Sequence, residues 1–249
     1  RSAPAPSSSD HGPAPRRIIL VRHGESEGNV DHAAYCRIPD SRIRLTERGL
    51  RQARAAGHAL GSRPELVGPR GTFRVYYSPY MRSRQTALEV VKGIVMASSA
   101  DSQGPDADTA AAATAAQLAR INMMPEPRLR EQDFGNFQNQ ADMRRQQRTR
   151  REFGRFFYRF REGESGADVY DRVGSFVGTL KRSAHRVKPR RPGDGETRVP
   201  AEAVVLVSHG LSIRLFLMRY LKWSVKQFDG VWNPENCDIW VLERRGANG

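Results

Sequence analysis

Two apolar runs in this chain end in the same dipeptide, His-Gly, and this repetition constrains the fold more than any other feature. Residues 18–21 lead to His23-Gly24, and residues 203–207 lead to His209-Gly210. Short apolar runs of this kind are typical of buried strands. In an open α/β sheet, ligands bind beyond the carboxyl ends of the strands, so both imidazoles are expected at one crevice. A single His-Gly would indicate a turn, whereas two matching strand ends indicate a site.

The hydrophobic pattern predicts strands that alternate with helices. Strands are expected at residues 17–22, 73–78, 203–208 and 238–243, which are short apolar or β-branched runs. This alternation predicts an α/β fold with a largely parallel sheet.

Two of the expected helices have recognisable beginnings. Ser78 is the expected N-cap of the first, with Pro79 at its first position. Ser165 and Asp168 form the expected capping box of the second. The buried face of the first helix is predicted to carry Leu88, Val91 and Val95, and that of the second Val169, Val173, Phe176, Val177 and Leu180.

Length and composition predict the domain organisation. With 249 residues, the chain is expected to form one domain over residues 17–249, after a disordered tail at residues 1–16. Surface insertions are expected near residues 61–72, 97–116 and 187–200, where Gly, Pro, Ala and charged residues accumulate.

Charge and cysteine content limit the class of protein. The formal net charge of +14 favours an anionic partner. Cys36 and Cys237 are too few for a disulfide scaffold and fit no zinc spacing. No apolar run reaches the roughly 20 residues that cross a bilayer, and the first residues lack the apolar segment of a secretory signal. A cytoplasmic protein that does not bind a membrane is therefore expected.

Six ordered blocks of sequence carry a resemblance to a known family. The first is Arg22-His23-Gly24-Glu25-Ser26-Glu27-Gly28-Asn29, and the others lie at residues 45–53, 78–87, 129–131, 163–169 and 207–210. Together they resemble the histidine phosphatase superfamily, also called phosphoglycerate mutase-like. Residues 130–138 and 153–160 are most similar to a plant and fungal branch whose substrates are poorly defined. The resemblance implies a three-layer α/β/α sandwich with one strand reversed in a mostly parallel mixed sheet.

The resemblance also implies catalytic roles for three residues. His23 matches the family nucleophile, His209 the second histidine, which donates a hydrogen bond to the transferring phosphoryl group, and Glu131 the proton donor. The positive charges of Arg22, Arg82 and His209 are expected to push the pKa of His23 below about 6.5, which keeps a lone pair available. A phosphate dianion that arrives beside Glu131 would favour its protonated form by repulsion between like charges.

Binding of the phosphoryl group requires positive charge around its oxygens. Arg22 and Arg82 match the family's phosphate-pocket arginines, and a guanidinium can bind two phosphate oxygens at once. Asn29, Ser26, Arg37 and Gly210 complete the set of expected substrate-binding residues. No metal or other cofactor is expected, because no second ligand cluster accompanies the His-x-Glu string at His23.

Residues 142–161 combine eight arginines with several aromatic residues. Phe153, Phe156, Phe157 and Phe160 are spaced i, i+3, i+4 and i+7, which predicts an amphipathic helix with its aromatic residues in the core. A rim that selects a multiply charged phosphate compound is the functional alternative. RNA binding lacks any known module here.

Three functions are compatible with this sequence. A metal-independent phosphatase that acts on a small phosphorylated substrate through phosphohistidine is favoured. A phosphoglycerate mutase is the first alternative, but the acid is followed by Gln132 and Asp133 where mutases have basic residues, and few residues follow the last strand. A binding protein without catalysis is the second alternative.

Overall fold

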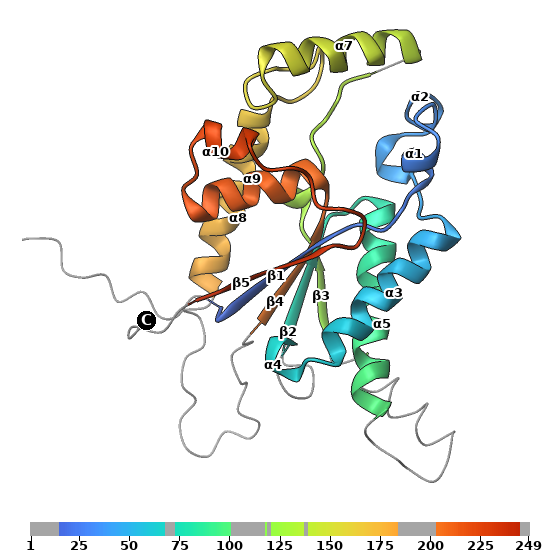
Figure 1. Ribbon diagram of the computed structural model, residues 1–249, viewed down its shortest axis with the longest axis vertical. Coiled ribbons are helices and arrows are strands. Elements are labelled where there is room, and N and C mark those ends of the chain that lie inside the picture. Colours follow the sequence, from blue (N-terminus) through green and yellow to red (C-terminus); the bar gives the residue numbers. More distant parts are fainter. Residues whose placement is uncertain are drawn as a thin grey trace, which may run out of the picture.

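A five-stranded sheet in the order β3-β2-β4-β1-β5 organises the computed structural model (Figure 1). The structure describes residues 15–67, 73–100, 118, 121–136, 139–183 and 203–244. The strands are β1 (Arg17–Arg22), β2 (Phe73–Tyr77), β3 (Asn122–Pro125), β4 (Ala203–Ser208) and β5 (Ile239–Glu243). The helices are α1 (Glu27–Val30), α2 (Ala34–Arg37), η1 (Asp40–Arg42), α3 (Glu47–Gly61), α4 (Pro64–Val67), α5 (Met81–Ala100), η3 (Pro127–Leu129), α7 (Gln140–Phe153), α8 (Gly166–Ser183), α9 (Gly210–Leu221) and α10 (Val225–Asp229).

The pairing of the strands brings the two His-Gly turns together. β1 and β4 are parallel neighbours, in a register that places Arg22 opposite Ser208. β2 pairs with both β4 and β3 in parallel, whereas β5 runs antiparallel to β1. The expectation of a mostly parallel sheet with one reversed strand is therefore confirmed. Both histidines follow directly after strands that end at the same edge.

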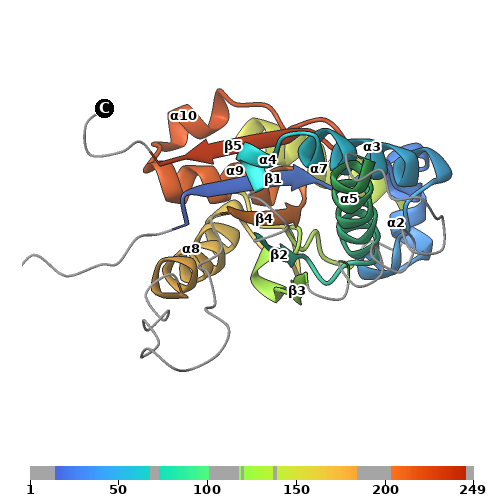
Figure 2. The same cartoon turned by 90° about the horizontal axis from the view of Figure 1, so that it is seen from below.

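Alternate residues along the central strands face two separate cores, one on each side of the sheet. In β1, Ile19 and Val21 pack with residues of α3 and α5, whereas Ile18 and Leu20 pack with residues of α8 and α9. Figure 2 shows α5 and α8 on opposite sides of the strands. This arrangement is the three-layer α/β/α sandwich that the family resemblance implies.

The strand predictions hold except for β3. Strands at residues 17–22 and 203–208 are confirmed, and β2 and β5 are each one residue shorter than expected. β3 is missing from the prediction because Asn122–Pro125 has only two apolar side chains between an Asn and a Pro. Its position at the edge of the sheet tolerates that composition.

The capping box of α8 is confirmed, but the predicted start of the other helix is wrong. The Ser165 hydroxyl accepts from the Asp168 N–H (3.2 Å) and the Asp168 carboxylate accepts from the Ser165 N–H (2.7 Å). The five apolar residues predicted for the buried face of α8 are all buried. In contrast, α5 begins at Met81, later than the predicted start at Pro79, and the Ser78 hydroxyl contacts both His209 Nε2 (2.8 Å) and the Tyr80 N–H (3.4 Å). Leu88 is 42% exposed, so its predicted burial is also wrong.

The predicted helix through residues 142–161 ends early. α7 stops at Phe153 because Gly154 has φ +108°, a backbone conformation that breaks the helix. After this break, Phe156 and Phe160 are buried, whereas Phe153 and Phe157 are 66% and 60% exposed. The prediction that all four phenylalanines enter the core is wrong for these two.

The expected insertions are only partly within the described residues. Residues 61–67 form the end of α3 and all of α4, and residues 97–100 belong to α5. Residues 1–14, 68–72, 101–116 and 187–200 lie outside the described part of the chain. Within that part, no helix is both long and apolar enough to span a membrane.

Candidate active site

His23 and His209 meet beyond the carboxyl ends of β1 and β4. The centroids of their rings are 5.1 Å apart, and the ring planes cross at 61°. Both side chains are buried, with exposures of 4% and 0%. The His23 N–H donates to the carbonyl of Ser208, the last residue of β4, at 2.9 Å. This bond continues the parallel pairing of the two strands and fixes one turn against the other.

The backbone around His23 determines which ring nitrogen is free. Its Nδ1 lies 2.8 Å from the Gly24 carbonyl oxygen, which can only accept, so Nδ1 carries the proton. The Nε2 atom therefore holds the lone pair. Thr86 accepts from the Gly24 N–H at 3.0 Å, and Asn236 donates to the His23 carbonyl at 2.9 Å. These two hydrogen bonds fix the backbone of the proposed nucleophile and of the residue that follows it.

His209 is oriented by two hydroxyl groups. Its Nε2 lies 2.8 Å from the Ser78 hydroxyl and 3.3 Å from the Ser83 hydroxyl. Its buried Nδ1 has no hydrogen-bond partner within the described residues. A serine hydroxyl can donate or accept, and when one donates to Nε2 the ring proton is on Nδ1. That proton can then be donated to a group bound beside His23.

Two guanidinium groups flank the histidine pair. Arg22 donates through Nη1 to the Pro234 carbonyl (2.7 Å), and Arg82 donates through Nη1 to the backbone and carboxylate oxygens of Asp40 (2.7 and 2.6 Å). Arg82 is 2% exposed and also lies 5.1 Å from the centre of the Tyr80 ring. These contacts hold the planar groups in place while leaving other N–H groups for an anion.

The electrostatic environment keeps both histidines neutral. Burial lowers the pKa of His23 well below its ordinary value, and the charges of Arg82 and Arg22 lower it further. Burial and Arg82 also lower the pKa of His209, with smaller effects from His23 and more distant arginines. The direction expected for His23 agrees, but burial, which the sequence did not reveal, is the largest cause.

Glu131 lies in a loop that three side chains hold in position. The Ser208 and Ser212 hydroxyls donate to the carbonyls of Leu129 and Arg130, both at 2.7 Å. Arg172 of α8 donates to the Glu131 carbonyl at 3.0 Å. The carboxylate oxygen Oε1 accepts from the Gln132 N–H at 3.0 Å and lies 3.1 Å from the Ser212 hydroxyl oxygen. Since Ser212 belongs to the first turn of α9, directly after His209, the acid is anchored beside the second histidine.

The remaining expected substrate-binding residues have different surroundings. Ser26 is fully buried, and its N–H and hydroxyl contact Asn29 Oδ1, both at 3.0 Å, in the capping box of α1. The same Asn29 oxygen lies 3.4 Å from Asn236 Nδ2, next to His23. Gly210 is the first residue of α9 and packs against Asn233. Arg37 is exposed and pairs with Asp31, and it makes no hydrogen bond to either histidine turn within the described residues.

Several functional side chains escaped the sequence reasoning. Ser78, Ser83 and Thr86 all contact the histidine turns from one segment that follows β2. Their spacing of five and three residues was visible in the third block, but nothing in it showed that the hydroxyls face His209 and Gly24. Asn236 lies more than 200 residues from His23 in sequence and carried no signal.

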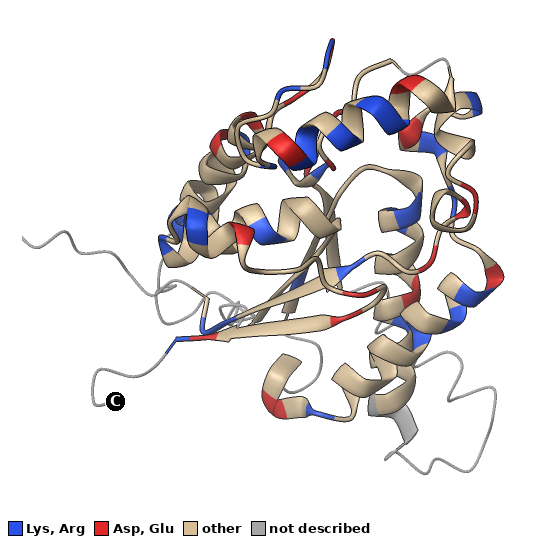
Figure 3. Cartoon of the chain, turned by 45° about the horizontal axis from the view of Figure 1, so that its top comes forward, with Lys and Arg blue, Asp and Glu red and all other residues tan. Residues whose placement is uncertain are grey.

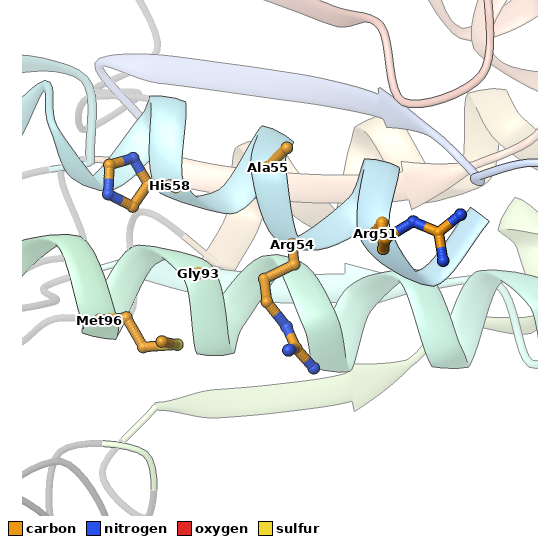
Figure 4. Close-up of a pocket in the computed structure, with 6 residues that line it drawn as sticks. All are labelled: Arg51, Arg54, Ala55, His58, Gly93 and Met96. Atoms are coloured by element: carbon orange, nitrogen blue, oxygen red, sulfur yellow. The ribbon is translucent and has the colours of Figure 1, made fainter. Parts of the chain in front are cut away.

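A pocket elsewhere on the molecule does not belong to this site. It has a volume of about 220 Å³, lies between α3 and α5, and is lined by Arg51, Arg54, Ala55, His58, Gly93 and Met96. Figure 4 shows that the Arg51 and Arg54 guanidinium groups do not converge on one point, and Arg54 is paired with Glu89. Among the described residues, no group of three His, Cys, Asp or Glu side chains is arranged to hold a metal ion.

The chain is similar to proteins of one superfamily. A sequence model of the histidine phosphatase superfamily (branch 1) matches residues 18–101 and 107–249. The phosphoglycerate mutase-like protein AT74 of Arabidopsis thaliana is 44% identical over 240 residues, which cover 95% of this chain and 67% of that protein. The broad-range acid phosphatase DET1 of Saccharomyces cerevisiae is 32% identical over 293 residues, which cover 92% of this chain and 85% of that protein.

A solved structure has the same fold. The mycobacterial glucosyl-3-phosphoglycerate phosphatase superposes with a TM-score of 0.60 over 92% of this chain and 91% of that chain, at 24% identity. The two chains therefore share their overall fold.

Proposed function

The chain belongs to the histidine phosphatase superfamily, and we propose that it hydrolyses phosphate monoesters through a phosphohistidine on His23, without a metal ion. One observation carries the proposal more than any other. The Gly24 carbonyl holds the proton on His23 Nδ1, so the neutral ring offers Nε2 as a nucleophile between two guanidinium groups. Relatives and structural neighbours that are phosphatases support the same activity.

The first half of the reaction transfers the phosphoryl group to the enzyme. His23 Nε2 attacks phosphorus in line with the ester oxygen, and Arg22, Arg82 and His209 Nδ1–H stabilise the charge on the other oxygens. The bond between phosphorus and the ester oxygen breaks. Its electron pair stays on that oxygen, which takes a proton from Glu131, so an alcohol leaves.

The second half returns the enzyme to its starting state. A water molecule attacks the phosphohistidine while the Glu131 carboxylate accepts one of its protons. The bond between phosphorus and Nε2 breaks, the electron pair returns to His23, and inorganic phosphate is released. In a mutase, the hydroxyl of a second phosphoglycerate would replace this water.

The test follows the phosphoryl group. The purified chain is mixed with p-nitrophenyl phosphate, quenched in base and examined by mass spectrometry for phosphohistidine on His23. We expect a phosphorylated peptide that contains His23, turnover that survives EDTA, and a loss of at least 10³-fold in His23→Ala. The matched control is His32→Ala, since His32 is exposed and has no motif around it.

Three results would contradict the proposal. They are activity in His23→Ala above one tenth of the unsubstituted protein, inactivation by EDTA that a divalent cation reverses, and no hydrolysis of any ester in a broad panel. Incubation with 3-phosphoglycerate and a bisphosphoglycerate primer shows whether water or the hydroxyl of a second phosphoglycerate accepts the phosphoryl group from His23. We expect phosphate release to exceed formation of 2-phosphoglycerate, because the Asp133 carboxylate near Glu131 disfavours a phosphoglycerate acceptor.

A further inference from the structure

One arginine of α8, Arg172, uses every nitrogen of its guanidinium group inside the protein. Nε and Nη2 donate to the two carboxylate oxygens of Glu164, at 3.0 and 2.9 Å. Nη1 donates to the carbonyls of Arg128 and Arg130, at 2.8 and 2.9 Å, and Nη2 also donates to the carbonyl of Glu131, at 3.0 Å. Figure 3 shows many basic residues along α7, and those arginines are mostly exposed, whereas the Arg172 side chain is only 11% exposed.

Glu164, the partner of Arg172, holds the residues that follow the proposed acid. Its carboxylate accepts from the Asp133 N–H at 3.1 Å, and its own N–H donates to the Asp133 carbonyl at 2.8 Å. The Glu164 carbonyl accepts from the side-chain amide of Gln132 at 2.7 Å. Its carboxylate also pairs with Arg130. Each residue from 130 to 133 is therefore bonded to Arg172, to Glu164 or to both.

The pair is ionised, and its hydrogen bonds are complete. Burial raises the pKa of Glu164, but the hydrogen bond and the charge of Arg172 outweigh burial, so this pKa stays below its ordinary value. A guanidinium group has five N–H donors, and those of Arg172 have five acceptors on the protein. Arg172 therefore has no donor left for a substrate, and any effect on catalysis must pass through the residues that it holds.

The position of the Glu131 carboxyl group depends on the backbone of this loop. Its Oε1 atom accepts from the Gln132 N–H at 3.0 Å, so even a contact of the side chain comes from the neighbouring backbone. A general acid must lie within hydrogen-bond distance of the oxygen that it protonates. A displacement of about 1 Å in a catalytic group can cost on the order of 10²-fold in rate. The carbonyls and N–H groups on both sides of Glu131 therefore matter to its chemistry.

We propose that Arg172, paired with Glu164, is a positioning residue that fixes the Glu131 carboxyl group against the leaving-group oxygen. This inference rests on the proposed function, in which Glu131 protonates that oxygen. Arg172 acts through the backbone of residues 128–131 and does not touch the substrate. Its loss should therefore slow mainly those substrates whose leaving group needs a proton.

The test compares substrates that differ in their need for this proton. In the unsubstituted chain and in Arg172→Gln, kcat/KM is measured for p-nitrophenyl phosphate, phenyl phosphate and glycerol 3-phosphate. This ratio reports the steps up to the first departure of the alcohol, so hydrolysis of the phosphohistidine does not obscure it. We expect the loss in Arg172→Gln to be at least about tenfold greater for phenyl phosphate and glycerol 3-phosphate than for p-nitrophenyl phosphate, because a misplaced acid forfeits part of a contribution of about 10²- to 10⁴-fold.

Arg172→Lys separates geometry from charge. Lysine keeps the positive charge beside Glu164, but its donors lie on a single nitrogen and cannot replace the planar fork that reaches several acceptors. We therefore expect Arg172→Lys to retain much of the preference for p-nitrophenyl phosphate. This variant also carries the test if Arg172→Gln does not fold, since removal of one partner from a buried ion pair is strongly destabilising.

A double variant shows whether Arg172 acts through Glu131. In a Glu131→Gln background the acid is already lost, so the further change Arg172→Gln should not increase the preference for p-nitrophenyl phosphate again. Residues that act as a unit give such non-additive effects. An equal further increase would mean that Arg172 acts on leaving groups by another route, which would overturn the inference.

Arg128→Gln is the matched control for loss of an ion pair in the same loop. Arg128 pairs with Glu126 and reaches the Ser175 and Thr179 hydroxyls of α8, at 3.2 and 2.9 Å. Its side chain thus joins the same loop to the same helix without contacting the carbonyls next to Glu131. We expect Arg128→Gln to lower the Tm and to leave the relative rates of the three substrates unchanged.

Three further results would overturn the inference. They are equal losses on all three substrates in Arg172→Gln, full restoration of the relative rates by Arg172→Lys, and the same change of preference in Arg128→Gln. These results leave the proposed function intact as long as Glu131→Gln alone shows the preference for p-nitrophenyl phosphate. Absence of hydrolysis of every ester in the unsubstituted chain would reject the proposed function itself.

Discussion

At His23, a single backbone carbonyl decides which ring nitrogen can react. The Gly24 oxygen accepts from Nδ1, and burial among positive charges keeps the ring neutral. A free imidazole would divide its proton between the two nitrogens and would be half protonated near pH 6.5. The fold therefore disfavours both inactive forms of the imidazole, the protonated ring and the tautomer with its proton on Nε2.

The lowered pKa of His23 predicts how the rate depends on pH. Since the neutral ring is the reactive form, kcat/KM for p-nitrophenyl phosphate should not decline at pH 6.5 but only at more acid pH, after correction for ionisation of the substrate. Arg82→Gln removes one of the charges that lower the pKa, so its acid limb should move toward neutral pH. A pH–rate profile from pH 4.5 to 8 makes the measurement. A decline centred at or above pH 6.5 in the unsubstituted protein would contradict it.

Replacement of Glu131 should affect substrates according to their leaving groups. In Glu131→Gln, esters of aliphatic alcohols should lose about 10²- to 10⁴-fold in kcat, because their oxygen needs the proton that Glu131 supplies. p-Nitrophenolate leaves without a proton, so its ester should lose far less. Steady-state kinetics on glycerol 3-phosphate and p-nitrophenyl phosphate compare the two. Equal losses would assign Glu131 to binding or folding.

The reacting residues could be predicted more completely than the residues that orient them. Strand ends and the family blocks pointed to His23, His209 and Arg82 because chemistry restricts those positions to few residue types. The hydroxyls of Ser78 and Ser83 contact His209 through a fold that joins segments 126 and more residues apart. Serine is common in loops for other reasons, so its presence there predicted a helix cap instead.

At the scale of elements, α3 and α5 approach so closely that glycine is required between them. A Cβ atom on Gly57 would lie 2.1 Å from the Val90 carbonyl oxygen, and one on Gly93 would lie 2.3 Å from the Arg54 carbonyl oxygen. The two helices cover one face of the sheet, and α5 also carries Ser83 and Thr86 into the site. The distance between α3 and α5 therefore influences where Ser83 and Thr86 lie, and through their hydrogen bonds it influences the two histidine turns.

This close packing predicts opposite effects for two similar substitutions. Gly57→Ala should destabilise the protein by about 1–3 kcal/mol, because backbone atoms must move to admit the methyl group. Gly178→Ala, within α8, meets only the end of the Arg182 side chain at 3.2 Å and should stabilise by up to about 1 kcal/mol through helix propensity. Denaturant unfolding of both variants provides the comparison. If the two substitutions changed the free energy of unfolding by similar amounts, the close contact between α3 and α5 would not be what makes Gly57 necessary.

The errors in predicting elements have identifiable causes. The phenylalanines after residue 152 have helical spacing, but Gly154 adopts a positive φ that no pattern of apolar residues reveals. β3 has too few apolar residues to be recognised, and its parallel pairing with β2 alone makes it a strand. Central strands such as β1 were predictable because burial on both faces requires a continuous apolar run.

At the scale of the whole molecule, the two buried histidines connect the site to stability. Their pKa values are lower in the folded state than the ordinary value of 6.5 in an unfolded chain. Below about pH 6.5 the unfolded chain therefore binds more protons than the folded one. Folding stability should fall as pH decreases from about 6.5 toward the folded-state pKa values.

Thermal unfolding between pH 7.5 and 5 tests this coupling. Each buried histidine should lower the free energy of unfolding by up to about 1.4 kcal/mol per pH unit below pH 6.5. The Tm should therefore decrease steadily over that interval in a buffer without phosphate. His209→Gln should show a weaker dependence on pH, and His32→Ala should behave as the unsubstituted chain. A Tm that stays constant from pH 7 to 5 would contradict the assignment of neutral histidines.

The place of β1 in the sheet also determines when the site can exist. β1 leads directly to His23 and lies between β4 and β5, which occupy residues 203–208 and 239–243. During synthesis, β1 leaves the ribosome before β4 and β5. It can pair with them only after both have been translated. Such long-range pairing is slow to form and leaves apolar edges open in the meantime. A nascent chain therefore carries His23 without its catalytic partners until both β4 and β5 have left the ribosome.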